Sequence, residues 1–170
     1  MQIPLFKTII VGDPSVGKTS LINYYCKPKT AILQNMPEGI VYQVKQVNLA
    51  EGSAKITIWD MTKPIRLQKQ REVFYRGAHT GALVYDVTRP ETLENLNQWH
   101  QDLRSFCPEI PLVVVGNKFD KGAGADHTHG MEFALSIRAN FMLTSTINGD
   151  GVVFLFERLA LNALHLTGYC

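Results

Sequence analysis

The residues with the clearest chemical potential lie near the amino terminus, where residues 12–20 read Gly-Asp-Pro-Ser-Val-Gly-Lys-Thr-Ser. This run fits the pattern G-x-x-x-x-G-K-[ST], in which backbone N–H groups converge on phosphate oxygens. Lys18 is predicted to reach the β- and γ-phosphates as the catalytic candidate, and the Thr19 hydroxyl is predicted to bind Mg²⁺. The residues expected to surround the phosphates are Pro14, Ser15, Val16, Gly17, Lys18, Thr19 and Ser20.

Such a loop works only between a strand and a helix, and the neighbouring residues predict both. Residues 6–11, Phe-Lys-Thr-Ile-Ile-Val, are apolar and β-branched and predict a buried strand. Residues 21–25, Leu-Ile-Asn-Tyr-Tyr, suit the start of a helix. A glycine-containing turn beside a surface lysine is the simpler alternative, but these flanks favour a phosphate site.

A second polar group, Asn117-Lys118-Phe119-Asp120, follows an apolar strand predicted at residues 111–116. A carboxylate such as Asp120 can accept hydrogen bonds from N1–H and the 2-amino group of guanine. Adenine lacks both donors and would leave this acceptor unpaired. The four residues would also suit an ordinary polar turn. Downstream of a phosphate loop they indicate a guanine nucleotide rather than an ATP-using enzyme.

The rest of the chain alternates predicted strands and helices, which indicates an α/β fold built on a doubly wound sheet. The other strands are predicted at residues 41–49, 55–59, 81–87 and 141–145, the first two as an antiparallel hairpin. Helices are predicted at residues 92–106, 131–139 and 152–166. Residues 27–39 and 60–71 are predicted to be irregular.

Bulk properties limit the possible functions. The 170 residues suit a single domain spanning residues 1–170. A net charge of +2, without a basic cluster, does not indicate nucleic acid. Three widely spaced cysteines suit reduced thiols inside the cell. The early first strand leaves no room for a signal peptide, and no apolar run is long enough to span a membrane. The expected location is therefore cytoplasmic.

With these motifs in hand, the chain resembles a small GTPase of the Ras superfamily, and within it a Rab. The other stretches that carry the resemblance are Trp59-Asp60, Phe74-Tyr75-Arg76-Gly77-Ala78-His79 and Tyr85-Asp86-Val87-Thr88. Residues 143–147, Leu-Thr-Ser-Thr-Ile, are a degraded form of the family's base-contacting E-T-S-A-K loop. The resemblance therefore assigns Ser145, Thr146 and Ile147 to the nucleotide, and Asp60 to a Mg²⁺-bound water.

The resemblance also implies the architecture and the ligands. It implies a three-layer P-loop NTPase fold of the small G protein type. This fold has a six-stranded, mostly parallel sheet with one antiparallel strand, and five helices on its two faces. The expected ligands are GTP or GDP with Mg²⁺. Rabs usually end in a variable tail with prenylated cysteines, but this sequence ends Gly168-Tyr169-Cys170 without a C-a-a-X motif. Membrane contact is therefore expected only through a lipidated tail, if the chain has one.

Four positions depart from the family pattern when the chain is counted without gaps. Pro37 replaces a threonine that offers a hydroxyl to Mg²⁺ and its backbone to the γ-phosphate, and proline has neither donor. Thr30 replaces the aromatic residue that stacks on guanine. Lys63 replaces the glycine beside the γ-phosphate, and Pro64 replaces the glutamine that orients the attacking water. GTP hydrolysis is therefore expected to be slow.

Two functions remain open from the sequence. The first is a Rab-like regulator of vesicle trafficking or signalling that acts through protein partners. The second is a pseudo-GTPase scaffold, whose guanine nucleotide is structural and never cycles. The expected partner surfaces are Pro28–Gly39, Met61–Gly77 and the apolar start of the last helix at Val153 and Phe154. That helix is either more fully buried than in relatives or exposes an apolar face to a partner.

Overall fold

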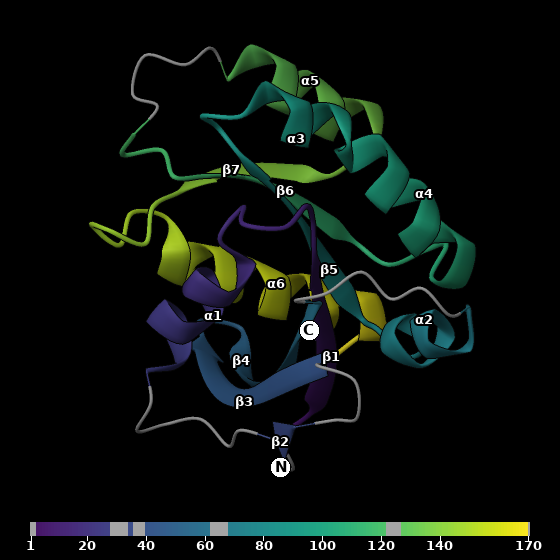
Figure 1. The fold of residues 1–170 in the computed structure, drawn as a ribbon. Coiled ribbons are helices and arrows are strands. Elements are labelled where there is room, and N and C mark those ends of the chain that lie inside the picture. The colour runs from purple at the N-terminus through teal and green to yellow at the C-terminus, as the bar shows by residue number, and fades with distance from the viewer. Residues whose placement is uncertain (1–2, 28–33, 36–39, 62–67, 122–126, 170) are drawn as a thin grey trace.

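The computed structural model describes residues 3–27, 34–35, 40–61, 68–121 and 127–169. Its centre is a seven-stranded sheet with the strand order β2-β3-β4-β1-β5-β6-β7 (Figure 1). The strands are β1 (Leu5–Val11), β2 (Gln34–Asn35), β3 (Ile40–Leu49), β4 (Gly52–Met61), β5 (Thr80–Asp86), β6 (Leu112–Asn117) and β7 (Asn140–Thr144). The helices are α1 (Lys18–Cys26), α2 (Gln68–Tyr75), α3 (Pro90–Glu94), α4 (Leu96–Phe106), α5 (Thr128–Ser136) and α6 (Val152–Thr167).

The sheet is mostly parallel, as the sequence predicts. Strand β1 pairs in parallel with β4 and β5, and β5, β6 and β7 continue the parallel order. The hairpin β3–β4 is antiparallel, and its register brings Leu49 opposite Gly52. The predicted α/β fold is therefore confirmed. The predicted count of six strands omits the two-residue strand β2, which lies within the stretch predicted to be irregular and pairs antiparallel with β3.

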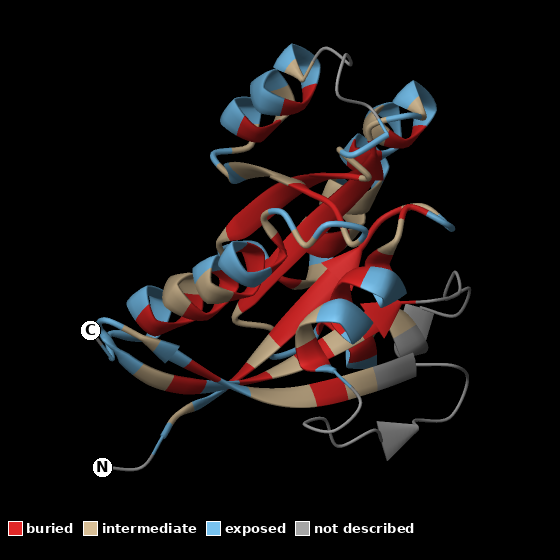
Figure 2. Cartoon of the chain, turned by 90° about the vertical axis from the view of Figure 1, so that its left-hand side faces the viewer, coloured by how far each residue is buried: buried red, intermediate tan, exposed pale blue. Residues whose placement is uncertain are grey.

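Side chains of the parallel strands alternate between two cores, one on each face of the sheet. Ile10 packs with Leu21 of α1 and Leu155 of α6. Its neighbour Ile9 packs on the other face with residues of α2, α4 and α5, including Leu103. All five of these side chains are fully buried. The sheet is therefore apolar on both faces, and Figure 2 shows its strands buried between helices whose outer sides are exposed.

Helix α2 was not predicted, because residues 60–71 were expected to be irregular. Asp60 and Met61 instead complete β4, and Gln68–Tyr75 form the helix. Phe74 and Tyr75 at its end are fully buried. Their packing against the sheet stabilises a short helix whose polar first half gives little sequence signal.

The two helices predicted over residues 92–106 and 131–139 have different bounds in the structure. The helix predicted over residues 92–106 is two helices, α3 from Pro90 and α4 from Leu96, with Asn95 between them. Proline is well suited to the first turn of a helix, so α3 starts earlier than its apolar pattern indicates. Helix α5 ends at Ser136, and Arg138 with φ of 56° turns the chain towards β7. Among the described helices, none is long and apolar enough to cross a bilayer.

Candidate functional site

The predicted site residues meet at one edge of the sheet. Strands β1, β5 and β6 are neighbours and parallel, so the loops after Val11, Asp86 and Asn117 leave the sheet side by side. The carboxyl ends of parallel strands in such folds form the usual ligand crevice. A pocket of about 280 Å³ opens there. It is lined by Ser15, Gly17, Lys18, Thr19, Ser20 and Lys118.

Two glycines allow the phosphate loop to follow its path. Gly12 has φ of 147°, and a Cβ atom there would lie 2.1 Å from the carbonyl oxygen of Val84. Gly17 has φ of 100°, and its Cβ would lie 2.3 Å from Nδ2 of Asn117. Both positions therefore combine a backbone conformation that favours glycine with a contact that excludes a side chain.

Side-chain donors hold the carbonyl groups of the phosphate loop. The Nζ atom of Lys18 donates 2.8 Å hydrogen bonds to the carbonyl oxygens of Gly12 and Asp13. Lys18 is 5% exposed. Burial lowers its pKa, and the carboxylates of Asp60 and Asp13 oppose that shift. A lysine ammonium has three donors, and acceptors in the described residues take two of them, which leaves one for a ligand in the pocket.

The next three carbonyl groups of the loop are held from other elements. Nη2 of Arg89 donates to Pro14 at 3.0 Å, and Nζ of Lys118 donates to Ser15 at 2.8 Å. Nδ2 of Asn117 donates to Val16 at 2.8 Å. Every carbonyl oxygen from residue 12 to residue 16 therefore accepts a hydrogen bond from a side chain.

The predicted base-reading residues form one hydrogen-bonded unit. Oγ of Ser145 donates to Oδ1 of Asp120 at 2.6 Å, and Oγ1 of Thr144 donates to Oδ1 of Asn117 at 2.9 Å. Asn117 also donates to Val16 of the phosphate loop. It therefore ties the phosphate loop to the chain that carries the predicted base-reading residues. Thr146 is half-buried in the same turn, whereas the side chain of Ile147 is 76% exposed. The backbone N–H of Ile147 donates to Oγ of Ser145.

Thr19 and Asp60 provide the donor set for a divalent cation. The Thr19 hydroxyl donates to Oδ2 of Asp60, which is 3% exposed. Oδ1 of Asp60 is buried and accepts no hydrogen bond from the described part of the chain. Burial raises the pKa of Asp60, although Thr19 and Lys18 act in the opposite direction. A buried carboxylate oxygen without a partner beside a hydroxyl fits Mg²⁺, which binds proteins through few oxygen ligands.

Sequence reasoning missed Asp86, which joins the two loops from β5. Its carboxylate is 1% exposed and accepts hydrogen bonds from Nζ of Lys118 at 2.7 Å and from the N–H and hydroxyl of Thr88. Burial alone would raise the pKa of Asp86, but the bonds from Lys118 and Thr88 outweigh it and lower that pKa. The sequence signal was available, because Asp86 is a carboxylate at the end of a buried strand.

Asp13 was also missed, although it lies within the phosphate loop. Its carboxylate accepts hydrogen bonds from Nδ2 of Asn95 at 2.7 Å and from Nε1 of Trp99 at 2.8 Å. Asn95 directly precedes α4, and Trp99 lies in the first turn of that helix. The loop is therefore anchored on the helical layer as well as on the sheet.

The remaining predicted residues divide into two groups. Thr30, Pro37, Lys63 and Pro64 lie outside the described residues, as does most of the predicted partner segment Pro28–Gly39. In the apolar start of α6, Val153 and Phe154 are 47% and 68% exposed. Their neighbours Val152, Leu155 and Phe156 are fully buried. Of the two alternatives for this helix, the exposed apolar face is therefore the one observed.

The fold and the anchored loops define a P-loop protein of the small G protein class. A sequence model of the Ras family matches residues 7–165, so the chain belongs to the Ras family. Its curated relatives are Rab-related. It is 31% identical over 151 residues to Ras-related protein RABA6b of Arabidopsis thaliana, covering 87% of this chain and 66% of that protein.

Two further relatives support a Rab-like small GTPase. Ras-related protein Rab-18-B of Danio rerio is 33% identical over 165 residues, which is 95% of this chain and 80% of the relative. Ras-related protein Rab-7b of Paramecium octaurelia is 38% identical over 122 residues, which is 69% of this chain and 59% of the relative.

Proposed function

We propose that this chain binds GTP or GDP with Mg²⁺ and acts through protein partners as a Rab-like regulator, with slow GTP hydrolysis. The observation that carries the proposal is the tie between the two loops through Asn117. Its amide donates to Val16 of the phosphate loop and accepts from Thr144 at the end of β7. Thr144 directly precedes the base loop, which consists of Ser145, Thr146 and Ile147. A ligand that fits both loops has a phosphate chain and a base at a fixed separation.

The base loop supports guanine. Ser145 donates to one oxygen of Asp120 and so orients the carboxylate. Asp120 is otherwise exposed and can accept two hydrogen bonds from the N1–H and 2-amino groups of guanine. Hydrogen bonds to a charged acceptor contribute about 1.5–3 kcal/mol each, so a base without these donors binds more weakly.

The phosphate loop supports a nucleotide di- or triphosphate. The third donor of Lys18 is available to a phosphate oxygen, and the negative phosphate would offset the burial that lowers the pKa of Lys18. Thr19 would ligate Mg²⁺ directly, and Asp60 would hold a water bound to the ion. The bound ion would neutralise phosphate charge.

Slow hydrolysis is inferred from the sequence. Pro64 stands where the family resemblance puts the water-orienting glutamine, and a proline side chain has no polar group. Loss of one preorganised polar group at a transition state costs on the order of 3 kcal/mol. A pseudo-GTPase scaffold with a structural nucleotide is the second candidate, and the missing glutamine favours it to the same degree.

Base identity is tested by releasing nucleotide from the purified protein and by measuring the binding of GDP, IDP and ADP. GDP is expected to bind most tightly. IDP lacks the 2-amino group and should bind about tenfold more weakly. Asp120→Asn should reduce the preference for GDP over IDP, while the exposed control Glu132→Gln should retain it. Tight ADP binding would contradict the proposal.

Turnover separates the two candidates. Single-turnover hydrolysis of [γ-³²P]GTP is followed for a day with and without Mg²⁺. Slow release of phosphate that depends on Mg²⁺ would support a cycling regulator. Retention of intact GTP throughout would support the scaffold.

The proposed partner surfaces include the exposed face of α6. Val153 and Phe154 expose neighbouring apolar side chains there. Exposed apolar groups that lie together are typical of protein–protein interfaces. The chain is proposed to act in the cytoplasm, with membrane contact only through a lipidated tail.

A further inference from the structure

We propose that Arg89 is a positioning residue of the nucleotide site, which acts with Asp86 to clamp the phosphate loop at Pro14. The proposal rests on the proposed nucleotide-binding function and goes further, because it names a residue that controls how long the nucleotide stays bound. Arg89 lies outside both sequence motifs of the site.

Within the described residues, the guanidinium of Arg89 makes two polar contacts. Nη2 donates to the carbonyl oxygen of Pro14 at 3.0 Å, and Nε pairs with Oδ2 of Asp86 at 3.3 Å. Arginine presents its donors in a rigid planar fork, so the two contacts fix each other's direction. The side chain therefore links the end of β5 to the phosphate loop.

The backbone of Arg89 is itself held in place. Its N–H donates to the carbonyl oxygen of Asp86 at 2.9 Å, which closes a turn. Its carbonyl oxygen accepts bonds from the N–H of Thr92 at 3.0 Å and from the Thr92 hydroxyl at 2.7 Å. Thr92 is 1% exposed. The side chain therefore extends from an ordered start of α3, which reduces the entropy lost in holding the loop.

Asp86 balances the charge of the clamp. Oδ2 of Asp86 is shared between Nε of Arg89 and Nζ of Lys118. Each cation also holds one of two successive carbonyl groups, Pro14 for Arg89 and Ser15 for Lys118. One buried carboxylate thus organises two cations that grip adjacent peptide groups.

The gripped residues need such support. Ser15 has φ of 64°, a left-handed conformation that is unfavourable for a residue with a side chain. The peptide groups on both sides of Ser15 are those that Arg89 and Lys118 hold. Without Arg89, the loop can relax around Pro14 towards conformations whose N–H groups no longer converge on a phosphate.

These contacts favour an indirect role over direct phosphate binding. Both groups that Arg89 contacts are acceptors within the protein, a carbonyl and a carboxylate. A clamp that shapes the loop affects GDP and GTP equally, because both nucleotides use the same loop. A cation bound to the γ-phosphate would affect GTP alone.

The test compares the wild type, Arg89→Gln and Arg89→Lys, with Arg158→Gln on the exposed side of α6 as the control. Dissociation of fluorescent mant-GDP and mant-GTP is measured by stopped flow with excess unlabelled nucleotide. We expect Arg89→Gln to speed release of both nucleotides by about tenfold or more, as for loss of one charge-assisted hydrogen bond. Arg89→Lys should be intermediate because an ammonium cannot reproduce the fork. The control should match the wild type.

Other outcomes overturn the clamp. Acceleration of mant-GTP release alone would make Arg89 a phosphate ligand. Wild-type release rates in Arg89→Lys would mean that only the positive charge of Arg89 matters, not its planar fork. Wild-type release rates in Arg89→Gln would mean that Arg89 does not act on the site.

A second readout works even without nucleotide binding. If the wild type bound no guanine nucleotide, the proposed function would fail, but the clamp could still be judged by amide hydrogen exchange. Exchange at Ser15, Val16 and Gly17 should be faster in Arg89→Gln than in the control. Equal exchange would overturn the clamp independently.

Discussion

The Nζ atom of Lys118 donates a 2.8 Å hydrogen bond to the carbonyl oxygen of Ser15, and both residues have φ of 64°. A left-handed conformation costs an ordinary residue roughly 1–2 kcal/mol. Such strain persists where the surrounding structure holds it and is typical of functional sites. Here two strained residues from different loops support each other at the entrance of the candidate nucleotide site.

Lys118→Met is expected to remove the support that Lys118 gives to the strained backbone at Ser15. The variant loses the bonds to Ser15 and Asp86 but keeps most of the side-chain volume. Because Lys118 is about one-third exposed, the free energy of unfolding should fall by only about 1 kcal/mol. GDP affinity should fall about tenfold. Urea unfolding and fluorescent nucleotide titration measure the two effects. The exposed neighbour Lys121→Met should change neither quantity, and a similar loss there would contradict a specific role of Lys118.

Gly12→Ala is expected to be among the most damaging single substitutions. The new Cβ would lie 2.1 Å from the carbonyl oxygen of Val84, a backbone atom that cannot move without displacing β5. We expect a loss of about 3 kcal/mol or more of unfolding free energy. Gly77→Ala is the matched control, because φ there is +74° but nothing lies within 4 Å of the new Cβ. It should cost only about 1 kcal/mol. The urea midpoints of the two variants are compared. Equal losses of stability would show that the positive φ, and not the contact with Val84, causes the damage at Gly12.

A double-mutant cycle on Asp13 and Trp99 tests the anchor between the loop and α4. Trp99→Phe removes the Nε1 donor that lies 2.8 Å from Oδ1 of Asp13 and keeps an aromatic ring. It should lower the unfolding free energy by about 1 kcal/mol. In the Asp13→Ala background, where no side-chain acceptor remains, the same change should cost much less, which gives a coupling energy near 1 kcal/mol. A coupling energy of zero would show that the bond between Asp13 and Trp99 does not stabilise the loop.

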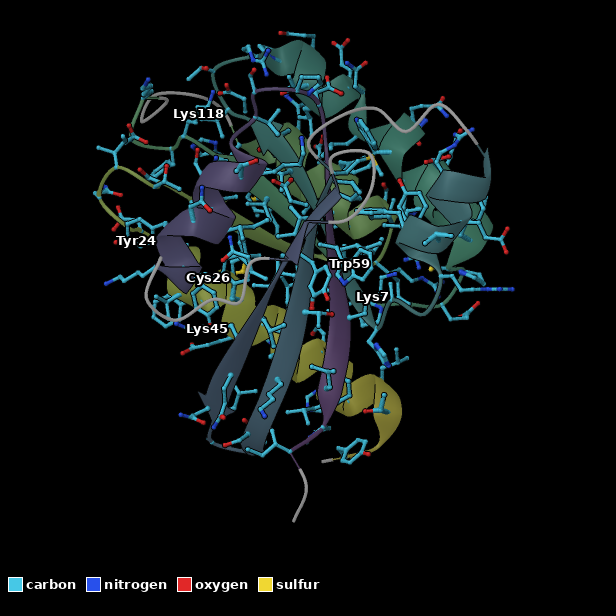
Figure 3. All side chains as sticks on the ribbon, turned by 60° about the horizontal axis from the view of Figure 1, so that its bottom comes forward. Lys7, Tyr24, Cys26, Lys45, Trp59 and Lys118 are labelled. Carbon is cyan, nitrogen blue, oxygen red and sulfur yellow. The ribbon has the colours of Figure 1, made fainter. Side chains whose placement is uncertain are left out.

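Lys7 gives a prediction about pH. Its Nζ atom lies 3.9 Å from the centre of the Trp59 ring, as Figure 3 allows the reader to follow, and donates to the carbonyl oxygens of Val73 and Arg76. Burial nevertheless lowers the pKa of Lys7 to about 8, whereas the nearby Cys107 acts to raise it. In the unfolded chain the pKa is near 10.4, so the unfolded state binds more protons between these values. The Lys7 contribution to stability should therefore increase as pH rises from 8 to about 10.4.

The measurement compares wild type and Lys7→Met by urea unfolding at several pH values. The difference in unfolding free energy should move in favour of the wild type by on the order of 2 kcal/mol over that range, because solvent screening of the half-buried side chain reduces the full linkage value. Subtraction of the variant cancels the titration of the tyrosines. A difference that stays constant with pH, or that moves towards the variant, would contradict the lowered pKa.

Much of the fold was predictable because its signals are local. The apolar strands 6–11, 81–87 and 111–116 were predicted within one residue of β1, β5 and β6. Their continuous apolar character reflects burial on both faces of the sheet. The helix Gln68–Tyr75 was not predictable, because its stability depends on the burial of Phe74 and Tyr75 by distant elements.

The sequence by itself determined the chemistry of the site. The spacing within residues 12–20 predicts a phosphate loop, and Asn117, Lys118 and Asp120 are the predicted donors and acceptors for guanine. These motifs are short, so their residue types and spacing can be read from the sequence without knowledge of the rest of the chain.

Only the tertiary structure decided how the site is held. Arg89 is 75 positions from Pro14 in the chain, and Lys118 is 103 positions from Ser15. They meet because β1 lies beside β5 and β5 beside β6. Strand order depends on the packing of both cores, and no local pattern encodes it. The sequence therefore predicts the groups that would touch a nucleotide, and the fold determines which groups hold them in place.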